Sequence, residues 1–349
     1  MQVTTIGLDI AKNVLQVHGV DALGAVVERK RLSRAKTLEF FKEQKPCLVG
    51  MEACGSAHYW GRQIAALGHD VRLISPAYVK PYVKRSKTDA ADAAGICEAV
   101  SRPHMRFVPV KSEQTQAVAL IYKTRSLLVA QRTALANALR AHFGEAGIIA
   151  AQGPAGFATL VTRLRCEDHG LKDLARVGLL IMADLIVATE DQIGKLDAQI
   201  KVLIKNDETC QRLQEVPGIG PVAAGTLMAL SGDVSRFRSG RDFAAWLGLT
   251  PRQNSSGDKV RLGRITKAGD KGLRTLLVLG AMALIRHTRG NPDKGIKPMA
   301  SAGEATPWLR KLLERRPPLV AAVALAAKTA RIVWAMMAKG EKYRQVQAC

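Results

Sequence analysis

The sequence contains few aromatic residues and no closely paired cysteines. Phenylalanine, tryptophan and tyrosine make up 5% of the 349 residues, whereas hydrophobic residues as a whole reach 47%. We therefore expect a core built mainly from leucine, valine, isoleucine and alanine. The six cysteines form no C-x-x-C pair, and none stands at zinc-finger spacing with histidine. This pattern predicts reduced thiols and argues against a disulfide framework or a structural zinc site.

Acidic residues are also scarce relative to basic ones. The chain has 52 lysines and arginines against 30 aspartates and glutamates, which gives a net charge of +22 at pH 7. A surface with so much positive charge repels itself, and a polyanion is its usual partner because neutralised phosphates release counterions. The composition therefore favours a nucleic-acid-binding protein over an inert basic surface or a ribosome-associated protein.

Long hydrophobic runs are absent as well. The first residues, MQVTTIGLDIAK, lack the basic segment followed by an apolar segment that is typical of a secretory signal. The two most apolar stretches, Leu276–Ile285 and Leu319–Ala327, are too short to span a bilayer. We therefore predict a cytoplasmic protein without a membrane partner.

The first hundred residues alternate between strand-like and helix-like patterns and predict a mixed α/β domain. Three strands come first and are followed by alternating helices and strands, which is the ribonuclease-H-like order. In that arrangement the first strand lies centrally, with the fourth parallel beside it. The predicted strands are Val3–Ile10, Val14–Val20, Ala25–Leu32, Cys47–Met51 and Val71–Ile74, and the predicted helices are Ser33–Glu43, Ser56–Leu67 and Asp89–Val100.

The rest of the chain is predicted to be largely helical. Glu113–Phe143 has no proline or glycine, and Asp184–Lys205 carries a heptad stripe of isoleucines at 186, 193 and 200. These long helices fit either an antiparallel pair within one chain or a coiled coil between chains. The remaining predicted elements are helices at Val222–Ser231, Leu273–His287 and Pro318–Ala338 and a polar loop at Gly290–Pro307.

Two acidic residues occupy places where a charge is costly. Asp9 lies inside the apolar strand Ile6–Ile10, and Glu52 ends the apolar strand that begins at Cys47. A buried carboxylate is expensive unless it is paired or bound to a metal ion. In a ribonuclease-H-like sheet these two strands are neighbours, so we expect the two carboxylates to converge.

Two further acids, Asp89 and Asp92, are three positions apart on a predicted helix and therefore share one face. Taken singly, the acids have simpler explanations: a helix N-terminal acid, a solvated helix residue or, for Asp9, a salt-bridged core residue. Together the four carboxylates predict a site for Mg²⁺ or Mn²⁺, which prefer oxygen ligands. In phosphodiester chemistry, two such ions activate the attacking oxygen and stabilise the leaving one.

A polar turn in the last third of the chain combines serines with basic residues. Ser255 and Ser256 precede Gly257 and are followed by cations that can surround a phosphate, namely Lys259, Arg261, Arg264, Lys267, Lys271 and Arg274. A flexible loop that contacts phosphates without catalysis explains the same pattern.

A second glycine-containing turn lies upstream, at Val216–Gly220. Gly218 and Gly220 are typical of a helix-hairpin-helix turn, in which glycine lets backbone N–H groups approach a DNA phosphate. An ordinary turn between two helices has the same spacing. The basic residues downstream favour the DNA contact.

Several of these segments, in this order, resemble the DEDD transposases of bacterial insertion sequences. The matching segments are Gly7–Lys12, Met51–Ala53, Lys87–Ala93, the Pro-Gly-Ile-Gly turn, Leu247–Pro251, Ser255–Gly257 and Arg264–Asp270. The resemblance covers nearly the whole chain. It implies an enzyme that cuts and rejoins DNA, is guided by an RNA from the non-coding end of its element, and works as a homo-oligomer, either a dimer or a tetramer.

The resemblance also implies three segments: a catalytic domain like that of Holliday-junction resolvases (RuvC-like) at 1–110, a helical coiled-coil segment at 111–207 and a C-terminal transposase domain at 208–349. The nucleophile falls on Ser256, with Ser255 as the adjacent alternative. In the family the serine forms a transient phosphoserine link with DNA, and the acids of one subunit meet the serine of another. The four acidic positions, which imply Mg²⁺ or Mn²⁺, fall on Asp9, Glu52, Asp89 and Asp92.

Three other functions fit parts of the pattern. A Holliday-junction-resolvase-like nuclease would use the four acids and water, and would leave the Ser-Ser-Gly segment without a catalytic role. A sugar kinase or actin-like ATPase also begins with a strand that carries Gly-x-Asp, but it needs further glycine-rich phosphate loops that this sequence lacks. A non-catalytic nucleic-acid scaffold explains the charge but not Asp9 and Glu52 in apolar strands.

Overall fold

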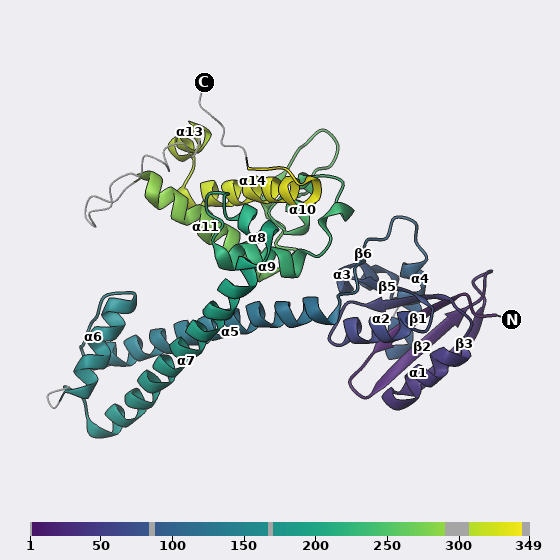
Figure 1. The fold of residues 1–349 in the computed structure, drawn as a ribbon, viewed down its shortest axis with the longest axis horizontal. Helices are drawn as coiled ribbons and strands as arrows, with labels where there is room; N and C mark the ends of the chain where they lie inside the picture. Colours follow the sequence, from purple (N-terminus) through teal and green to yellow (C-terminus); the bar gives the residue numbers. More distant parts are fainter. Residues whose placement is uncertain (1, 84–87, 167–169, 290–306, 344–349) are drawn as a thin grey trace. The chain divides into compact units, whose positions relative to one another are not determined.

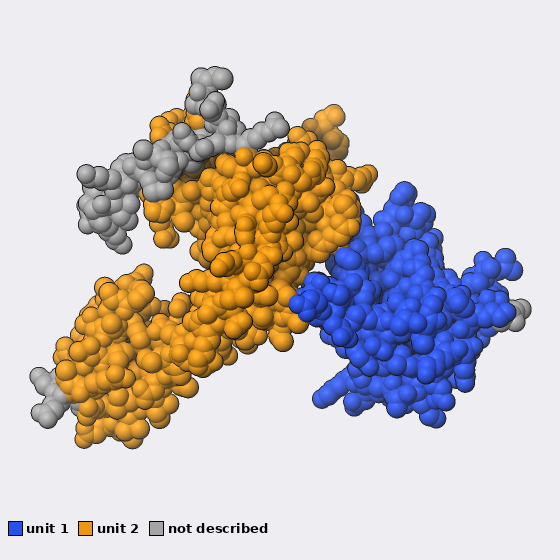
Figure 2. Space-filling model, in the orientation of Figure 1, with its two compact units in different colours: residues 1–116 blue, residues 117–349 orange. Residues whose placement is uncertain are grey.

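The computed structural model describes residues 2–83, 88–166, 170–289 and 307–343. Lys87, Cys349 and all of the predicted loop at 290–307 except its last residue lie outside these residues. The chain divides into two compact units, unit 1 at residues 1–116 and unit 2 at residues 117–349 (Figure 2). Unit 1 contains a six-stranded sheet, and unit 2 is mainly helical.

Unit 1 is built on a mixed sheet. Its strands are β1 (Thr5–Ile10), β2 (Val14–Val20), β3 (Val26–Ser33), β4 (Leu48–Glu52), β5 (Asp70–Ile74) and β6 (Phe107–Val108), in the order β3-β2-β1-β4-β5-β6 (Figure 1). The first three strands form an antiparallel meander, β1, β4 and β5 run parallel, and β6 is antiparallel to β5. The first strand is therefore central, with the fourth parallel beside it, as predicted.

Helices cover both faces of this sheet. They are α1 (Arg34–Glu43), α2 (Ala57–Ala65), α3 (Pro76–Val79), the 3-10 turn η1 (Lys80–Tyr82) and α4 (Asp89–Val100). On one face, α1 and α2 bury Phe41 and Trp60 in a common core with Leu8 of β1. On the other face, α4 packs against β1 and β4. The sequence patterns predicted α1, α2 and α4 but not the short elements α3, η1 and β6.

A long pair of antiparallel helices begins at the last residues of unit 1 and makes up the first part of unit 2. The elements here are α5 (Glu113–Glu145), α6 (Pro154–Arg165) and α7 (Asp173–Lys205), and α7 begins well before the predicted start at Asp184. Arg125 of α5 pairs with Asp197 of α7, and Arg132, further along α5, pairs with Glu190, which lies earlier in α7. The two helices therefore run antiparallel. The predicted isoleucine stripe of α7 is buried within the chain. The structure therefore contains the antiparallel pair, and a coiled coil between chains stays a prediction.

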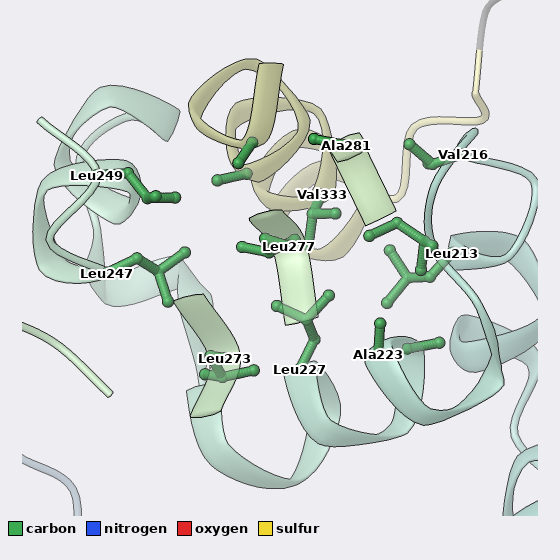
Figure 3. Close-up of a cluster of buried hydrophobic side chains, with 14 of the residues drawn as sticks. Leu213, Val216, Ala223, Leu227, Leu247, Leu249, Leu273, Leu277, Ala281 and Val333 are labelled. Carbon is green, nitrogen blue, oxygen red and sulfur yellow. The ribbon is translucent and has the colours of Figure 1, made fainter. Parts of the chain in front are cut away.

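The rest of unit 2 packs around one hydrophobic core (Figure 3). Its elements are α8 (Glu208–Leu213), α9 (Pro221–Ser231), η2 (Val234–Arg236), α10 (Gly240–Trp246), β7 (Pro251–Gln253), β8 (Leu262–Ile265), α11 (Lys271–Arg289), α13 (Pro307–Arg315) and α14 (Pro318–Lys339). Leu227 of α9, Leu277 of α11 and Val333 of α14 are all buried in this core. The helices predicted at 222–231, 273–287 and 318–338 correspond to α9, α11 and α14.

α14 is, by length and composition, apolar enough to cross a membrane, which the shorter apolar stretch Leu319–Ala327 did not indicate. Ala322, Ala326, Ala330 and Val333 of this helix are fully buried in the core of unit 2. Burial is partial, however, because 39% of the apolar stretch is buried and Leu319 and Val320 are exposed.

Candidate active site

Two glycines on neighbouring strands let a helix approach the sheet closely. Gly7 and Gly50 are register partners on the parallel strands β1 and β4. A Cβ at Gly7 would lie 2.1 Å from the carbonyl oxygen of Ala93, and a Cβ at Gly50 would lie 2.7 Å from Cβ of Val100. Neither position has room for a side chain, so α4 lies directly against the strand backbones.

The same face of the sheet carries the two strand carboxylates. Side chains two positions apart on a strand point to the same face. Asp9 therefore shares the α4 face with Gly7, and Glu52 shares it with Gly50. Leu8, one position before Asp9, is fully buried on the opposite face. Both acids stand at the carboxyl ends of their strands, where the strands approach the first turn of α4.

The first turn of α4 brings the other two acids to this place. Asp89 and Asp92 precede the buried residues Ala93 and Ile96 by four positions each, so they continue the sheet-facing stripe of the helix toward its N-terminus. The Thr88 hydroxyl caps the helix by accepting a backbone hydrogen bond of 3.2 Å from the first turn. The cap fixes where the helix begins and thus where the two carboxylates lie.

Electrostatics link the four acids directly. The pKa of Asp9 is raised from its ordinary value of 3.8 to about 6, first by burial and then by the negative charges of Asp92, Asp89 and Glu52. Among the described residues, no ion pair involves Asp9, Asp89 or Asp92. The fold therefore gathers like charges at a cost in stability.

A divalent cation fits this donor set. Carboxylate oxygens are the ligands that Mg²⁺ and Mn²⁺ prefer, and a doubly charged ion would remove the repulsion that raises the pKa of Asp9. Within the described ranges, no three acidic, histidine or cysteine side chains lie close enough together to enclose an ion. A negative charge shifts the pKa of a neighbour over a longer distance than a metal–ligand bond. The raised pKa of Asp9 therefore agrees with the absence of a closed group of ligands if repulsion keeps the carboxylates apart. A bound ion would draw them together.

Two exposed arginines extend the acid-bearing face across the neighbouring strands. Cross-strand register aligns Asp9 with Gln16 of β2 and Gln16 with Arg31 of β3. Arg29 lies beside His18 in the same way, and the pKa of His18 is lowered by burial and by the charge of Arg29. Both arginines are exposed. They were not among the predicted site residues, because only the register between strands connects them to Asp9.

Ser256 lies at the exposed tip of a hairpin in unit 2. The strands β7 and β8 form this hairpin, which the sequence patterns did not predict. At the tip, Ser256 and Lys259 form an isolated antiparallel bridge, and Gly257 has a φ of 57°. Glycine adopts this left-handed conformation without strain, which explains its place directly after the serine.

The two adjacent serines differ in their hydrogen bonds. The Ser255 hydroxyl accepts the backbone N–H of Arg261 at 3.1 Å and so helps to close the hairpin. The backbone carbonyl of Ser256 accepts the N–H of Lys259 at 3.3 Å, whereas its hydroxyl has no hydrogen-bond partner among the residues that the structure describes. Of the two serines, Ser256 has the hydroxyl that is available for chemistry.

The predicted phosphate-binding residues lie on this hairpin and on the turn that follows it. Five of them are exposed and form no ion pair with any described residue, namely Lys259, Arg261, Arg264, Lys267 and Lys271. Arg274 differs, because its guanidinium donates hydrogen bonds of 3.0 Å to the carbonyls of Leu247 and Gly269. Arg274 therefore stabilises the turn, and the other five present free positive charge.

The two glycines of the predicted DNA-contacting turn have different surroundings. Gly218 has a φ of 87°, and a Cβ there would lie 3.1 Å from the backbone of Gly280 on α11. Gly220 is exposed at the N-cap of α9, with open space around the position of a Cβ. Packing explains Gly218, whereas Gly220 is open to a ligand.

Comparison with known proteins gives a consistent result. A profile of IS110-type DEDD transposases matches residues 6–147, and a profile described as Transposase IS116/IS110/IS902 family matches residues 210–294. A protein of Pseudomonas aeruginosa described as a probable family 20 transposase is 49% identical over 348 residues, which is 99% of each chain. The transposases for insertion sequence elements IS1111A of Coxiella burnetii and IS1328 of Yersinia enterocolitica are 40% and 38% identical, over 97% of this chain and 91% and 98% of their own lengths.

A ribonuclease-H-like unit with four acids and a mainly helical second unit define the class of DEDD transposases. This chain belongs to the IS110 family of insertion-sequence transposases and is a DNA transposase. The predicted resemblance is thereby confirmed. The first matched region contains all four acids, and the second contains the hairpin with Ser256.

Proposed function

We propose that this transposase cuts and rejoins DNA with two groups of residues. The acids Asp9, Glu52, Asp89 and Asp92 hold Mg²⁺ or Mn²⁺, and Ser256 is the nucleophile. The observation that carries the proposal is the effect of three carboxylates on the pKa of Asp9, at the point where two paired glycines admit α4.

The sheet and α4 hold the acids in place before any substrate binds. β1 and β4 are central strands with a hydrogen-bonded neighbour on each side, so Asp9 and Glu52 stand on a rigid base. A bound divalent ion would polarise the phosphoryl group and stabilise the leaving oxygen. Charges that are placed in advance stabilise a transition state most effectively, because they need no rearrangement during the reaction.

The serine step is an exchange of phosphate esters. Attack of the Ser256 hydroxyl oxygen on a backbone phosphorus forms a serine–phosphate ester and breaks the bond to a deoxyribose oxygen. The serine gives up its proton, and the deoxyribose oxygen takes one and leaves as a hydroxyl. Attack by the hydroxyl of another DNA end reverses the exchange and frees the serine. The exposed Lys259 and Arg261 supply positive charge near the phosphoryl oxygens.

The proposal includes a guide RNA and self-association. The net charge of +22 supports binding of RNA in addition to DNA, since each phosphate that is neutralised adds to affinity. α7 exposes an apolar stripe at helical spacing, which supports assembly into a dimer or tetramer. The stripe consists of Leu174, Val177, Ile181 and Leu185. The RuvC-like character of the first segment and the segment boundaries near 110 and 207 also belong to the proposal.

A trap for the covalent intermediate tests the serine. The protein is incubated with Mg²⁺, end-labelled donor DNA and RNA from the non-coding end of the element, and the products are separated on a denaturing gel. We expect a protein–DNA adduct with the wild type and with Ser255→Ala, and none with Ser256→Ala. Asp9→Asn should bind DNA and form no adduct.

The other outcomes distinguish the alternatives. An adduct that is lost only in Ser255→Ala would move the nucleophile by one position. Metal-dependent cleavage without an adduct, in the wild type and in both serine variants, would contradict the serine mechanism. The chain would then act as a Holliday-junction-resolvase-like endonuclease that uses water.

A further inference from the structure

Unit 1 contains a hollow of about 430 Å³ that involves none of the four acids. It is lined by Arg34, Ala35, Ser56, Tyr59 and Trp60. Its volume falls within the range of roughly 300–1,000 Å³ that is typical of ligand sites. The lining supplies one guanidinium, two hydroxyls and two aromatic rings, and it contains no acidic side chain.

The hollow lies at the same end of the sheet as the acids but is lined by residues of α1 and α2, which cover the opposite face. β1, β3 and β4 run in the same direction, and Arg34 directly follows the end of β3. Its guanidinium donates a hydrogen bond of 3.3 Å to the carbonyl of Lys12, just beyond the end of β1. Ser56 follows Glu52 by four residues, which limits their separation to about 14 Å. A strand with a phosphate at the acids would pass over this end of the sheet to reach the hollow.

The two aromatic rings have different roles. Trp60 is 3% exposed and belongs to the core, whereas Tyr59 is 43% exposed. The rings meet edge to face with centroids 5.2 Å apart, and the Arg34 guanidinium lies over the Trp60 ring at 5.1 Å from its centroid. The buried Trp60 ring thus contacts both the exposed tyrosine ring and the arginine cation.

The backbone of Ser56 adopts an unusual conformation. Ser56 has a φ of 65°, in the left-handed region that is unfavourable for a residue with a Cβ. Its side chain makes no capping hydrogen bond to α2, so helix capping does not account for the serine. Strained residues are concentrated at binding and catalytic sites, and here the strain places an exposed hydroxyl beside the tyrosine.

We propose that this hollow binds one unpaired nucleotide of a strand whose backbone runs to the acid site, with the base stacked on Tyr59 and the phosphate near Arg34. Every base has a face that can stack on an aromatic ring, and arginine pairs with phosphate, so this combination is typical of sites for unpaired strands. Bases inside a duplex are already stacked and offer no free face. The site rests on the DNA substrate of the transposase and is independent of the serine mechanism.

Photocrosslinking tests the proposal on the full-length protein. Oligonucleotides carry 5-iodouracil at single positions up to about four nucleotides from the reacting phosphate, which corresponds to ~14 Å at about 3.4 Å per stacked nucleotide. One arm uses an unpaired DNA strand, a second uses the RNA of the element, and a third uses duplex DNA. Mass spectrometry identifies the crosslinked peptide. We expect a crosslink at Tyr59 in the DNA or RNA arm, which identifies the strand, and none with duplex.

Matched variants separate stacking from folding. Tyr59→Ala should lose the crosslink and bind the unpaired strand about fivefold or more weakly, with an unchanged melting temperature. Tyr59→Phe should retain both properties, and Tyr78→Ala, which removes another exposed tyrosine of unit 1, should leave the crosslink intact. Asp9→Asn should also keep the crosslink, so that failure of the catalytic proposal leaves this one standing. Absence of the crosslink in both single-strand arms, an equal crosslink with duplex, or wild-type binding by Tyr59→Ala overturns the proposal.

Discussion

The acid site of unit 1 and the serine hairpin of unit 2 are built in opposite ways. Asp9 and Glu52 stand on central strands, and α4 presses against Gly7 and Gly50 beside them. The hairpin around Ser256, by contrast, is exposed throughout residues 251–264 and is held by a few local hydrogen bonds. One site is fixed by the core, and the other is a projection from it.

This difference follows from what each site has to do. Four carboxylates repel one another, so a rigid support is needed to keep their backbone positions close in the absence of a cation. Under the proposed mechanism the serine has to reach a phosphate, and an exposed tip provides access. Substitutions near the acids should therefore change stability and activity together, whereas substitutions at the tip should change activity with stability nearly constant.

Replacing Asp9 by asparagine should cause the largest loss of activity and, at the same time, a gain in stability. Strand transfer should fall below detection, with nucleic-acid binding nearly intact, because the proposed metal site loses one of its four carboxylates. The folded-state pKa of Asp9 is raised from 3.8 to about 6, so the folded protein is less stable when Asp9 is charged. Its contribution to the stability of the folded state is fully present below about pH 3.8 and is lost as the pH rises through 6. At pH 7.5 without metal, Asp9→Asn should be more stable by on the order of 1–2 kcal/mol in urea denaturation.

Mg²⁺ provides the control for this prediction. It should raise the melting temperature of the wild type and of Glu39→Gln, an exposed acid on α1, but not that of Asp9→Asn. Full strand transfer by Asp9→Asn, or a lower stability than the wild type between pH 7 and 8 in chelator, would remove the basis for the metal site.

Gly7→Ala should cause the largest loss of stability. The new methyl group would lie 2.1 Å from the carbonyl oxygen of Ala93, so α4 has to move away from β1 and carries Asp89 and Asp92 with it. We expect a cost of about 3 kcal/mol in urea denaturation and a loss of strand transfer. Gly55→Ala is the matched control, because nothing lies within 4 Å of its Cβ position. If both variants were equally stable, the close contact of α4 with the sheet would be refuted.

Substitutions in the glycine turn of unit 2 should cause smaller changes in stability than Gly7→Ala. Gly218→Ala should cost about 1–3 kcal/mol, because its φ of 87° and its contact with Gly280 both exclude a side chain. Gly220→Ala should cost less than about 1 kcal/mol, since its Cβ position is open. Thermal denaturation measures both. Weaker DNA binding in Gly220→Ala alone would support the predicted phosphate contact, and unchanged binding in both variants would exclude it.

The strands and the helix that carry the four acids were predicted well because their sequences have strong patterns. Asp9 interrupts an apolar strand, and α4 has the predicted bounds, Asp89–Val100, because a threonine cap and an alanine-rich run define them. The paired glycines and the arginines of β3 escaped prediction for one reason. Their meaning depends on which residues face one another across strands, and that register is not visible in any single segment.

The serine hairpin was missed for a different reason. Strand prediction relies on alternation between a buried and an exposed face, and β7 and β8 lie almost entirely in solvent, with only Ile265 partly buried. Nothing in Pro251–Gln253 or Leu262–Ile265 therefore marks a strand. The resemblance placed the nucleophile on Ser256 with Ser255 as the alternative, and the sequence could not indicate that the Ser255 hydroxyl accepts a hydrogen bond from the Arg261 backbone.

The smallest expected effect, and the most direct test of the register, comes from β3. Arg31→Ala and Arg29→Ala should each weaken DNA binding a few-fold and reduce the slope of log affinity against log salt by about 0.9, the value for one phosphate contact. Lys30→Ala removes the same charge from the same strand. Its ammonium, however, lies on the opposite face, 5.5 Å from the Phe40 ring centroid and 3.4 Å from Glu28.

Lys30→Ala should therefore leave the salt dependence of binding unchanged, and Arg29→Ala combined with Arg31→Ala should reduce the slope by about 1.8. Fluorescence anisotropy with one duplex at several salt concentrations measures all four variants. An equal loss in Lys30→Ala and Arg31→Ala would mean that only net charge matters. A loss confined to the two arginines would show that DNA contacts the face of the sheet that carries Asp9. Side chains alternate between the two faces along β3, so the arginines point to that face and Lys30 points to the other.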